Sequence, residues 1–261
     1  MPIHVAFVAR VHVVMVEPKH EGNVGAIARV MTNFGVSSLR IVRPPPLGEE
    51  ARRRAMHGGG VLSAAKRFDQ IEEATVGMDL VIGTSDVDTA SERKFLRIAL
   101  SPRELAAKIA GFDGEVALLF GREDFGLRNE ELKACDMLVT IPANPEYPVL
   151  NVAQAASILL YEIHAAKPEP VRGRRMASGL EKEKLYEAFA DLLSVTKYPP
   201  HLRERTRVMF RRLMARAEPT TWEYHALMGV VVRAAKTIRR ERAKSVPKPR
   251  GGSTLRRRAN R

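Results

Sequence analysis

Short apolar segments rich in β-branched residues alternate with helical patterns through the first 165 residues of the chain. The strand-like segments are residues 11–17, 39–43, 79–85, 115–121 and 136–142, and the helical patterns are residues 24–34, 60–75, 101–110, 127–134 and 151–166. This alternation is typical of a parallel sheet with helices on both faces, so the sequence predicts an α/β domain. In such sheets ligands bind beyond the carboxyl ends of the strands.

The composition changes after residue 166. Residues 167–179 contain prolines, glycines and few apolar side chains, and we expect a linker there. Residues 180–243 carry helical patterns and predict a small all-α extension. Residues 244–261 hold seven Lys and Arg among 18 residues and predict a basic disordered tail. The expected α/β domain therefore occupies residues 1–166.

Basic side chains are concentrated in the last third of the chain. Residues 1–170 hold 19 Lys and Arg against 22 Asp and Glu, whereas residues 171–261 hold 24 against 8, a net charge of +16. This one-sided excess indicates a polyanionic partner, and nucleic acid is favoured over an anionic membrane because no strongly amphipathic anchor accompanies it. Arg203, Arg207 and Arg211 share one side of a helix, as candidates for nucleic-acid binding or as part of a solvated face.

The sequence also bears on the cellular compartment. No apolar run approaches the roughly 20 residues that a membrane helix needs, and the N-terminus lacks the basic region and cleavage site of a signal peptide. Cys135 is the single cysteine, which excludes an internal disulfide and a cysteine-based zinc site and fits a reducing compartment. We therefore expect a cytoplasmic protein without a membrane partner.

The first strand-following loop reads "EGNVGAIAR", residues 21–29. Gly22 and Gly25 permit a tight turn, and Asn23 lies near a helix N-terminus, where backbone amides attract anions. Arg29 falls one to two turns into that helix. The alternative is that Asn23 only caps the helix and Arg29 is a surface arginine. A dinucleotide-binding oxidoreductase is disfavoured, because the GxGxxG spacing and a suitably placed acidic residue about 20 positions later are missing.

Two further loops carry unusual residues. "LLFGREDFGL", residues 118–127, places Glu123 and Asp124 just past a strand end. The two carboxylates would repel a phosphate, so the loop suits a positively charged ligand or is a charged surface turn. "IPANPEYPVLNVAQAASILLYE", residues 141–162, has three prolines within eight residues. Its free carbonyls can accept hydrogen bonds from an adenine amino group. Asn151 sits at a helix start, where capping alone also explains it.

Together, in this order, the three loops resemble the signature motifs of the SPOUT class of S-adenosylmethionine-dependent RNA methyltransferases. The match is to the TrmH-like ribose 2′-O-methyltransferases. The wording "IPANPEY", the segment "VIGTS" at 81–85 and the helical extension look most like the TrmJ branch, which methylates the ribose at position 32 of the tRNA anticodon loop. The resemblance covers residues 11–165 closely and 180–240 loosely. It implies tRNA as substrate, an α/β domain with a C-terminal trefoil knot, and a homodimer with the active site near its interface.

The resemblance also implies site residues. S-adenosylmethionine would bind in the knot, at Thr84, Ser85, Asp86, Gly121, Ile141, Pro148, Val149 and Leu150. Many relatives have serine where this chain has Pro148 and Val149, so a hydroxyl role is absent there. Bacterial relatives have an arginine soon after "GTS", and Arg93 and Arg97 are both candidates for it here.

For catalysis the resemblance points to Arg29, Asn23, Glu123 and Asn151, without a metal. Because a guanidinium has a pKa above about 12, we expect Arg29 to clamp a phosphate and stabilise a developing alkoxide rather than act as a base. Asn23, Glu123 and Asn151 would orient the substrate and Arg29, with the first loop holding the RNA phosphate and ribose. The alternatives are another tRNA or rRNA position and a non-catalytic RNA-binding homologue, although the presence of all four residues argues against decay.

Overall fold

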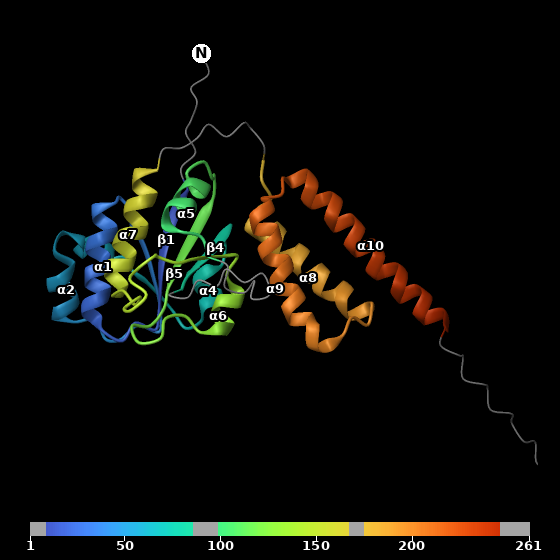
Figure 1. Cartoon of the computed structure of the whole chain (residues 1–261), viewed down its shortest axis with the longest axis horizontal. Helices are drawn as coiled ribbons and strands as arrows, with labels where there is room; N and C mark the ends of the chain where they lie inside the picture. The colour runs from blue at the N-terminus through green and yellow to red at the C-terminus, as the bar shows by residue number, and fades with distance from the viewer. Residues whose placement is uncertain (1–8, 86–98, 167–174, 246–261) are drawn as a thin grey trace, which may run out of the picture.

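A six-stranded parallel sheet forms the centre of the α/β part of the protein. The computed structural model describes residues 9–85, 99–166 and 175–245. The sheet order is β3-β2-β1-β5-β4-β6, and every pairing is parallel. Figure 1 shows β1, β5 and β4 of this sheet among the helices. The strands are β1 (Arg10–Val16), β2 (Ser38–Val42), β3 (Lys66–Phe68), β4 (Leu80–Thr84), β5 (Glu115–Phe120) and β6 (Met137–Val139). The α/β class predicted from the sequence is confirmed.

Helices cover both faces of this sheet. They are α1 (Glu21–Asn33), α2 (Glu49–Ala55), the 3₁₀ turn η1 (Met56–Gly58), α3 (Gly59–Ser63), α4 (Ile71–Thr75), α5 (Pro102–Ile109), α6 (Asn129–Ala134) and α7 (Val152–Ala165). Val13 and Met15 of β1 pack into the core that contains α1, α5 and α7. Val14 and Val16 point to the other face, where α4 and α6 contribute. Burial on both faces explains why the strand segments read as continuous apolar runs.

The helical pattern predicted for residues 60–75 is wrong in its middle. The structure breaks it into α3, β3 and α4. Strand β3 pairs with β2 at the edge of the sheet. Because its Lys66 and Arg67 are exposed and charged, the segment lacks the apolar pattern from which a strand is predicted. Gln70 and Glu73 then form a capping box that starts α4. Helix α2 was not predicted either, because only its Ala51 and Ala55 are buried.

The C-terminal extension consists of three helices. They are α8 (Gly179–Val195), α9 (Pro200–Ala217) and α10 (Thr221–Ser245). A separate apolar core joins them, with Leu185 of α8, Met214 of α9 and Val231 of α10 among its buried members. Phe189 and Phe210 stack with ring centroids 4.0 Å apart and tie α8 to α9. These helices occupy the segment for which the sequence predicts an all-α extension.

Polar contacts fasten the extension to the α/β part. The Asp79 carboxylate accepts a hydrogen bond from the Gly179 amide at 2.7 Å, and Lys182 donates to the Asp79 carbonyl. The Arg212 guanidinium donates to the Leu132 carbonyl at 2.8 Å. The described end of the expected linker is also held, because the Ala177 amide donates to the carbonyl of Pro219 at 2.9 Å. Residues 167–174 and the tail from 246 lie outside the described residues. Within the described ranges no helix is long and apolar enough to cross a membrane.

Candidate active site

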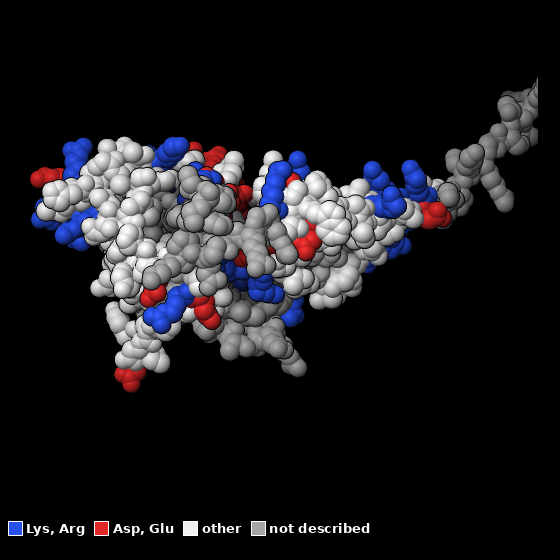
Figure 2. All heavy atoms as spheres, turned by 90° about the horizontal axis from the view of Figure 1, so that it is seen from above, with Lys and Arg blue, Asp and Glu red and all other residues white. Residues whose placement is uncertain are grey.

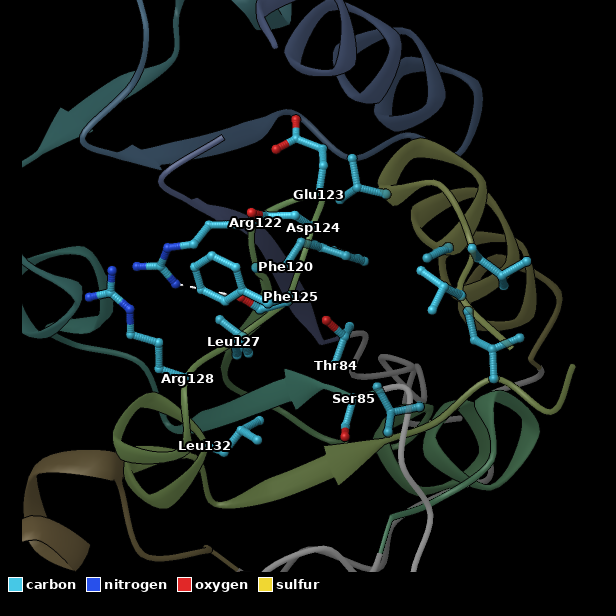
Figure 3. Close-up of a pocket in the computed structure, with 18 of the residues that line it drawn as sticks. Thr84, Ser85, Phe120, Arg122, Glu123, Asp124, Phe125, Leu127, Arg128 and Leu132 are labelled. Atoms are coloured by element: carbon cyan, nitrogen blue, oxygen red, sulfur yellow. Dashed lines mark hydrogen bonds between the residues drawn. The ribbon is translucent and has the colours of Figure 1, made fainter. Parts of the chain in front are cut away.

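A pocket of about 530 Å³ lies beyond the carboxyl ends of β4, β5 and β6. Its walls come from Thr84 and Ser85 at the end of β4, from residues 121–129 after β5, and from Ile141 and residues 148–150 after β6. Figure 3 shows Thr84 and Ser85 beneath the loop that carries Glu123, Asp124 and Phe125. A volume of this size suits a nucleoside-sized ligand. The position is the one expected for a ligand of a parallel sheet.

The structure brings the predicted cofactor residues to this one pocket. Those that line it are Thr84, Ser85, Gly121, Ile141, Pro148, Val149 and Leu150. Asp86, Arg93 and Arg97 lie outside the described residues. The end of β4 is pinned, because the Thr84 hydroxyl donates to the Leu119 carbonyl at 2.9 Å and the Ser85 amide donates to the Val139 carbonyl at 3.0 Å. That these residues contact a cofactor stays a prediction.

The loop after β5 returns tightly on itself. Arg122 and Gly126 exchange backbone hydrogen bonds of 3.1 and 2.9 Å. A Cβ on Gly121 would lie 2.0 Å from the carbonyl carbon of Gly126, so no larger residue fits there. Gly126 has φ +66°, a conformation that favours glycine. The two glycines of the motif therefore allow the turn that presents Glu123 at the pocket.

Arg122 anchors this loop, a role that the sequence did not reveal. Its buried guanidinium forms two 2.9 Å hydrogen bonds with Glu131 of α6 and one of 2.6 Å with Glu17, which follows β1. Burial alone would lower the pKa of Arg122, but the two carboxylates outweigh it and raise that pKa. The ring of Phe125, about half exposed, lies 5.3 Å from the guanidinium carbon. Glu17 at a neighbouring strand end is the only sequence signal that could have suggested this pairing.

Asn23, Glu123 and Asn151 form one hydrogen-bonded chain, although they come from three separate motifs. The Asn23 amide nitrogen donates to Glu123 at 2.9 Å, and the Asn151 amide nitrogen donates to the Asn23 oxygen at 3.3 Å. The Asn151 oxygen also accepts from the Ala153 amide at 2.9 Å and so caps α7. Asn151 therefore both caps α7 and belongs to the hydrogen-bonded chain.

Glu123 lies beside the turn that leads into α1. Its carboxylate accepts hydrogen bonds from the backbone amides of Lys19 and His20 at 2.9 and 3.3 Å. Burial alone would raise the pKa of Glu123, but these bonds and the one from Asn23 hold it below the ordinary value. The expected contact of the first loop with an RNA phosphate stays a prediction.

Arg29 lies apart from the polar chain. It is exposed on α1, six residues or about 9 Å of helix beyond Asn23. Within the described part of the chain its side chain has no hydrogen bond or ion pair. The structure thus joins three of the four predicted catalytic residues and leaves the fourth facing solvent in a single subunit.

The three arginines predicted to bind RNA have unequal surroundings. Arg203 donates to the Tyr198 carbonyl at 2.9 Å, and Arg207 makes an exposed 3.3 Å ion pair with Glu204. Arg211 is largely buried. It forms two hydrogen bonds with Glu183, at 2.6 and 2.8 Å, and a third with Asp136 at 3.2 Å. The spacing of four residues therefore does not make these side chains one solvent-facing row.

Comparisons with known proteins agree with this architecture. A model of the SpoU rRNA methylase family matches residues 10–161. The tRNA (cytidine-2′-O-)-methyltransferase TrmJ of Methanocaldococcus jannaschii is 40% identical over 215 residues, which cover 79% of this chain and 92% of the relative. The tRNA (cytidine/uridine/adenosine-2′-O-)-methyltransferase TrmJ of Pseudomonas aeruginosa is 36% identical over 250 residues, with coverage of 88% and 95%. The crystal structure of TrmJ from Z. mobilis superposes with a TM-score of 0.70 at 26% identity, covering 85% of this chain and 97% of that one.

Proposed function

The chain belongs to the SpoU rRNA methylase family, and we propose that it transfers a methyl group from S-adenosylmethionine to a ribose 2′-OH of tRNA. Both TrmJ relatives carry this activity in their names, and each matches well beyond the α/β part. The observation that carries the proposal is the 530 Å³ pocket with the Asn23–Glu123–Asn151 chain beside it. The target nucleotide is position 32 of the anticodon loop, as in the branch that the motifs resemble.

The composition of the pocket fits the cofactor. Ile141, Pro148 and Leu150 offer apolar walls for an adenine ring, and Glu123 and Asp124 offer negative charge for a sulfonium and an amino group. The proline-rich segment leaves backbone carbonyls free to accept hydrogen bonds from the adenine amino group. When bound, S-adenosylmethionine supplies the activated methyl group.

The residues of the chain act by positioning. A ribose hydroxyl is a weak nucleophile, so orientation and stabilisation of developing negative charge dominate such a reaction. Asn23 is fixed on both sides, by Glu123 and by Asn151, and Glu123 is held as a carboxylate that accepts hydrogen bonds. This network sets the relative positions of the three loops to which the substrate ribose would bind. Arg29 stabilises the alkoxide through its fixed planar donors.

A homodimer completes the site. Arg29 faces solvent in one subunit, so the proposed role requires a surface that closes over it. An apolar patch on α7, the helix beside α1, supports such closure: Ile158 and Tyr161 are 36% and 56% exposed, and Tyr161 packs edge-on against Phe34. We further infer that the chain after β6 forms the trefoil knot of the family, for which the TM-score of 0.70 with TrmJ from Z. mobilis is the support.

Methyl incorporation into separate RNA classes tests the proposal. The full chain is incubated with labelled S-adenosylmethionine and with unmodified tRNA or rRNA. We expect label in tRNA alone. Label in rRNA alone would show that rRNA, and not tRNA, is the substrate. Label in neither RNA would overturn the proposed methyltransferase activity.

A further inference from the structure

Helix α10 presents a line of exposed residues, which we call the outer stripe. It consists of Trp222, Ala226, Gly229, Arg233, Lys236 and Arg240. At about 100° per residue these positions lie within roughly 40° of a common direction. The buried residues Tyr224, Val231 and Ala235 lie on the opposite side of the helix, and α10 packs against α8. The outer stripe therefore points away from the rest of the extension.

The cations of the outer stripe are available to a partner. Arg233, Lys236 and Arg240 have no acidic partner among the residues that the structure describes. Arg239, toward the α8 side, pairs with Asp191. On α9, likewise, Arg211 is engaged with Glu183 and Asp136. Figure 2 shows basic side chains gathered toward the C-terminal end of α10.

Trp222 adds an aromatic platform to this charge. Its side chain is 78% exposed, yet it stands on an ordered turn, because the Thr220 amide and hydroxyl both donate to Glu223 at 2.8 Å. The small residues Ala226 and Gly229 separate it from the cations. A shallow hollow of about 440 Å³ runs along Gly229, Arg233 and the cations that follow. Stacking surfaces beside cationic grooves are what unpaired nucleotides bind.

We propose that the outer stripe of α10 is the RNA-docking surface of the extension. Arg233, Lys236 and Arg240 neutralise phosphates of one strand, and Trp222 stacks on an unpaired base. The inference rests on the proposed function, since it takes tRNA as the partner, and it moves the contact from α9 to α10. A second copy of the chain is disfavoured as the occupant because two such stripes would bring like charges together.

A charge-matched pair of full-chain variants tests the phosphate contacts. One variant changes Arg233, Lys236 and Arg240 to Gln, and the control changes Lys66, Arg67 and Arg103, exposed on the α/β part, to Gln. Binding of unmodified tRNA is measured across a salt series. The α10 variant should lose about two to three from the slope of log affinity against log salt, because each phosphate contact contributes roughly 0.7–0.9. Equal slopes for the variant and the control would overturn the proposal.

The single tryptophan of the chain reports the stacking contact directly. Saturating tRNA should quench the intrinsic fluorescence of Trp222 and protect it from acrylamide. Trp222→Ala should weaken binding roughly tenfold while keeping the salt slope, and Trp222→Phe should recover part of that loss. Fluorescence that does not change while tRNA binds, or a shift in sedimentation of Trp222→Ala that shows the stripe to be a protein interface, would overturn the proposal.

Methyl transfer at saturating tRNA separates this inference from the function on which it rests. The α10 variants should raise the KM for tRNA and leave kcat and S-adenosylmethionine binding unchanged. Stripe-dependent tRNA binding without any methylation would remove the proposed function and keep the docking surface. Methylation with unaltered tRNA binding in every variant of the outer stripe would keep the proposed function and remove the docking surface.

Discussion

The carboxylate of Glu123 is the point at which the first two motif loops meet. It accepts hydrogen bonds from Asn23 and from the backbone at Lys19 and His20. A residue that reads in the sequence as a charge near a cofactor therefore also joins the turn before α1 to the loop after β5. Because the pKa of Glu123 is lowered in the folded protein, the stability of the fold should depend measurably on pH.

Glu123→Gln should destabilise the protein at pH 7 and cease to do so in acid. The folded pKa of Glu123 lies below the ordinary 4.5, so its carboxylate stabilises the fold above that pH, and the contribution is lost as pH falls through the folded pKa. Thermal melts from pH 7 to pH 3 should show the gap to wild type closing below about pH 4.5. Glu130→Gln, which removes an exposed carboxylate paired with Lys133, is the control. A gap independent of pH would contradict this reading.

Arg29→Ala should lower turnover by a factor on the order of 10²–10³, the usual effect of removing one preorganised donor. Binding of S-adenosylmethionine should stay nearly intact, because Arg29 does not line the pocket. Arg29→Lys should also be poor, since an ammonium lacks the planar fork. Arg67→Ala, an exposed arginine on β3, is the matched control. Near wild-type methylation by Arg29→Ala would remove Arg29 from the catalytic assignment.

Leu150→Glu should abolish binding of S-adenosylmethionine, because Leu150 lines the pocket and a carboxylate there must be desolvated. Val149→Ser should change the affinity little, since Val149 is 50% exposed and we expect the backbone to make the contact. Calorimetry measures both affinities, with an unchanged melting temperature as the control for folding. Normal binding by Leu150→Glu would exclude this placement of the cofactor.

Single residues differ in how far the sequence could place them. Asn23, Glu123 and Asn151 were predictable because each stands in a motif at a strand end. The role of Arg122 was not predictable, since an arginine in a loop is usually exposed. Its burial depends on Glu17, which is distant in sequence, and on Glu131 of α6. Burial of a charge depends on partners that a local pattern cannot contain.

At the scale of elements, the apolar strands were predictable and the charged edge strand β3 was not. Strands β1, β2, β4, β5 and β6 consist mostly of apolar residues, so their composition predicts them. Strand β3 borders solvent and is mostly charged. Helix α9 shows the same limit in another form. Its arginine spacing predicts a shared side of the helix, and only the packing of α8 and α6 decides which of them reaches solvent.

Arg211→Ala should therefore destabilise the protein by about 3 kcal/mol, because it leaves the buried carboxylate of Asp136 without its cationic partner and removes two hydrogen bonds to Glu183. Arg207→Ala, whose ion pair with Glu204 is exposed, should change stability by less than about 0.5 kcal/mol. Urea unfolding of the full chain compares the two. Equal effects of the two substitutions would contradict the structural role given to Arg211.

For the whole molecule, the charge divides where the structure divides. The α/β part carries the pocket, and the extension carries a net positive charge. The hydrogen bonds between them, through Asp79, Asp136 and Leu132, give the extension a defined position relative to the pocket. Neither charge counting nor periodicity could predict that relation, because it depends on contacts between residues more than 50 positions apart.

Mapping at nucleotide resolution shows whether the chain methylates one ribose in tRNA. A ribose methylated at its 2′-oxygen resists alkaline cleavage of the bond that follows it. Unmodified tRNA treated with the full chain and S-adenosylmethionine should therefore show one protected bond, after nucleotide 32 of the anticodon loop, and none when the cofactor is omitted. Methyl groups found only on bases, or a cleavage ladder identical with and without the cofactor, would contradict the account.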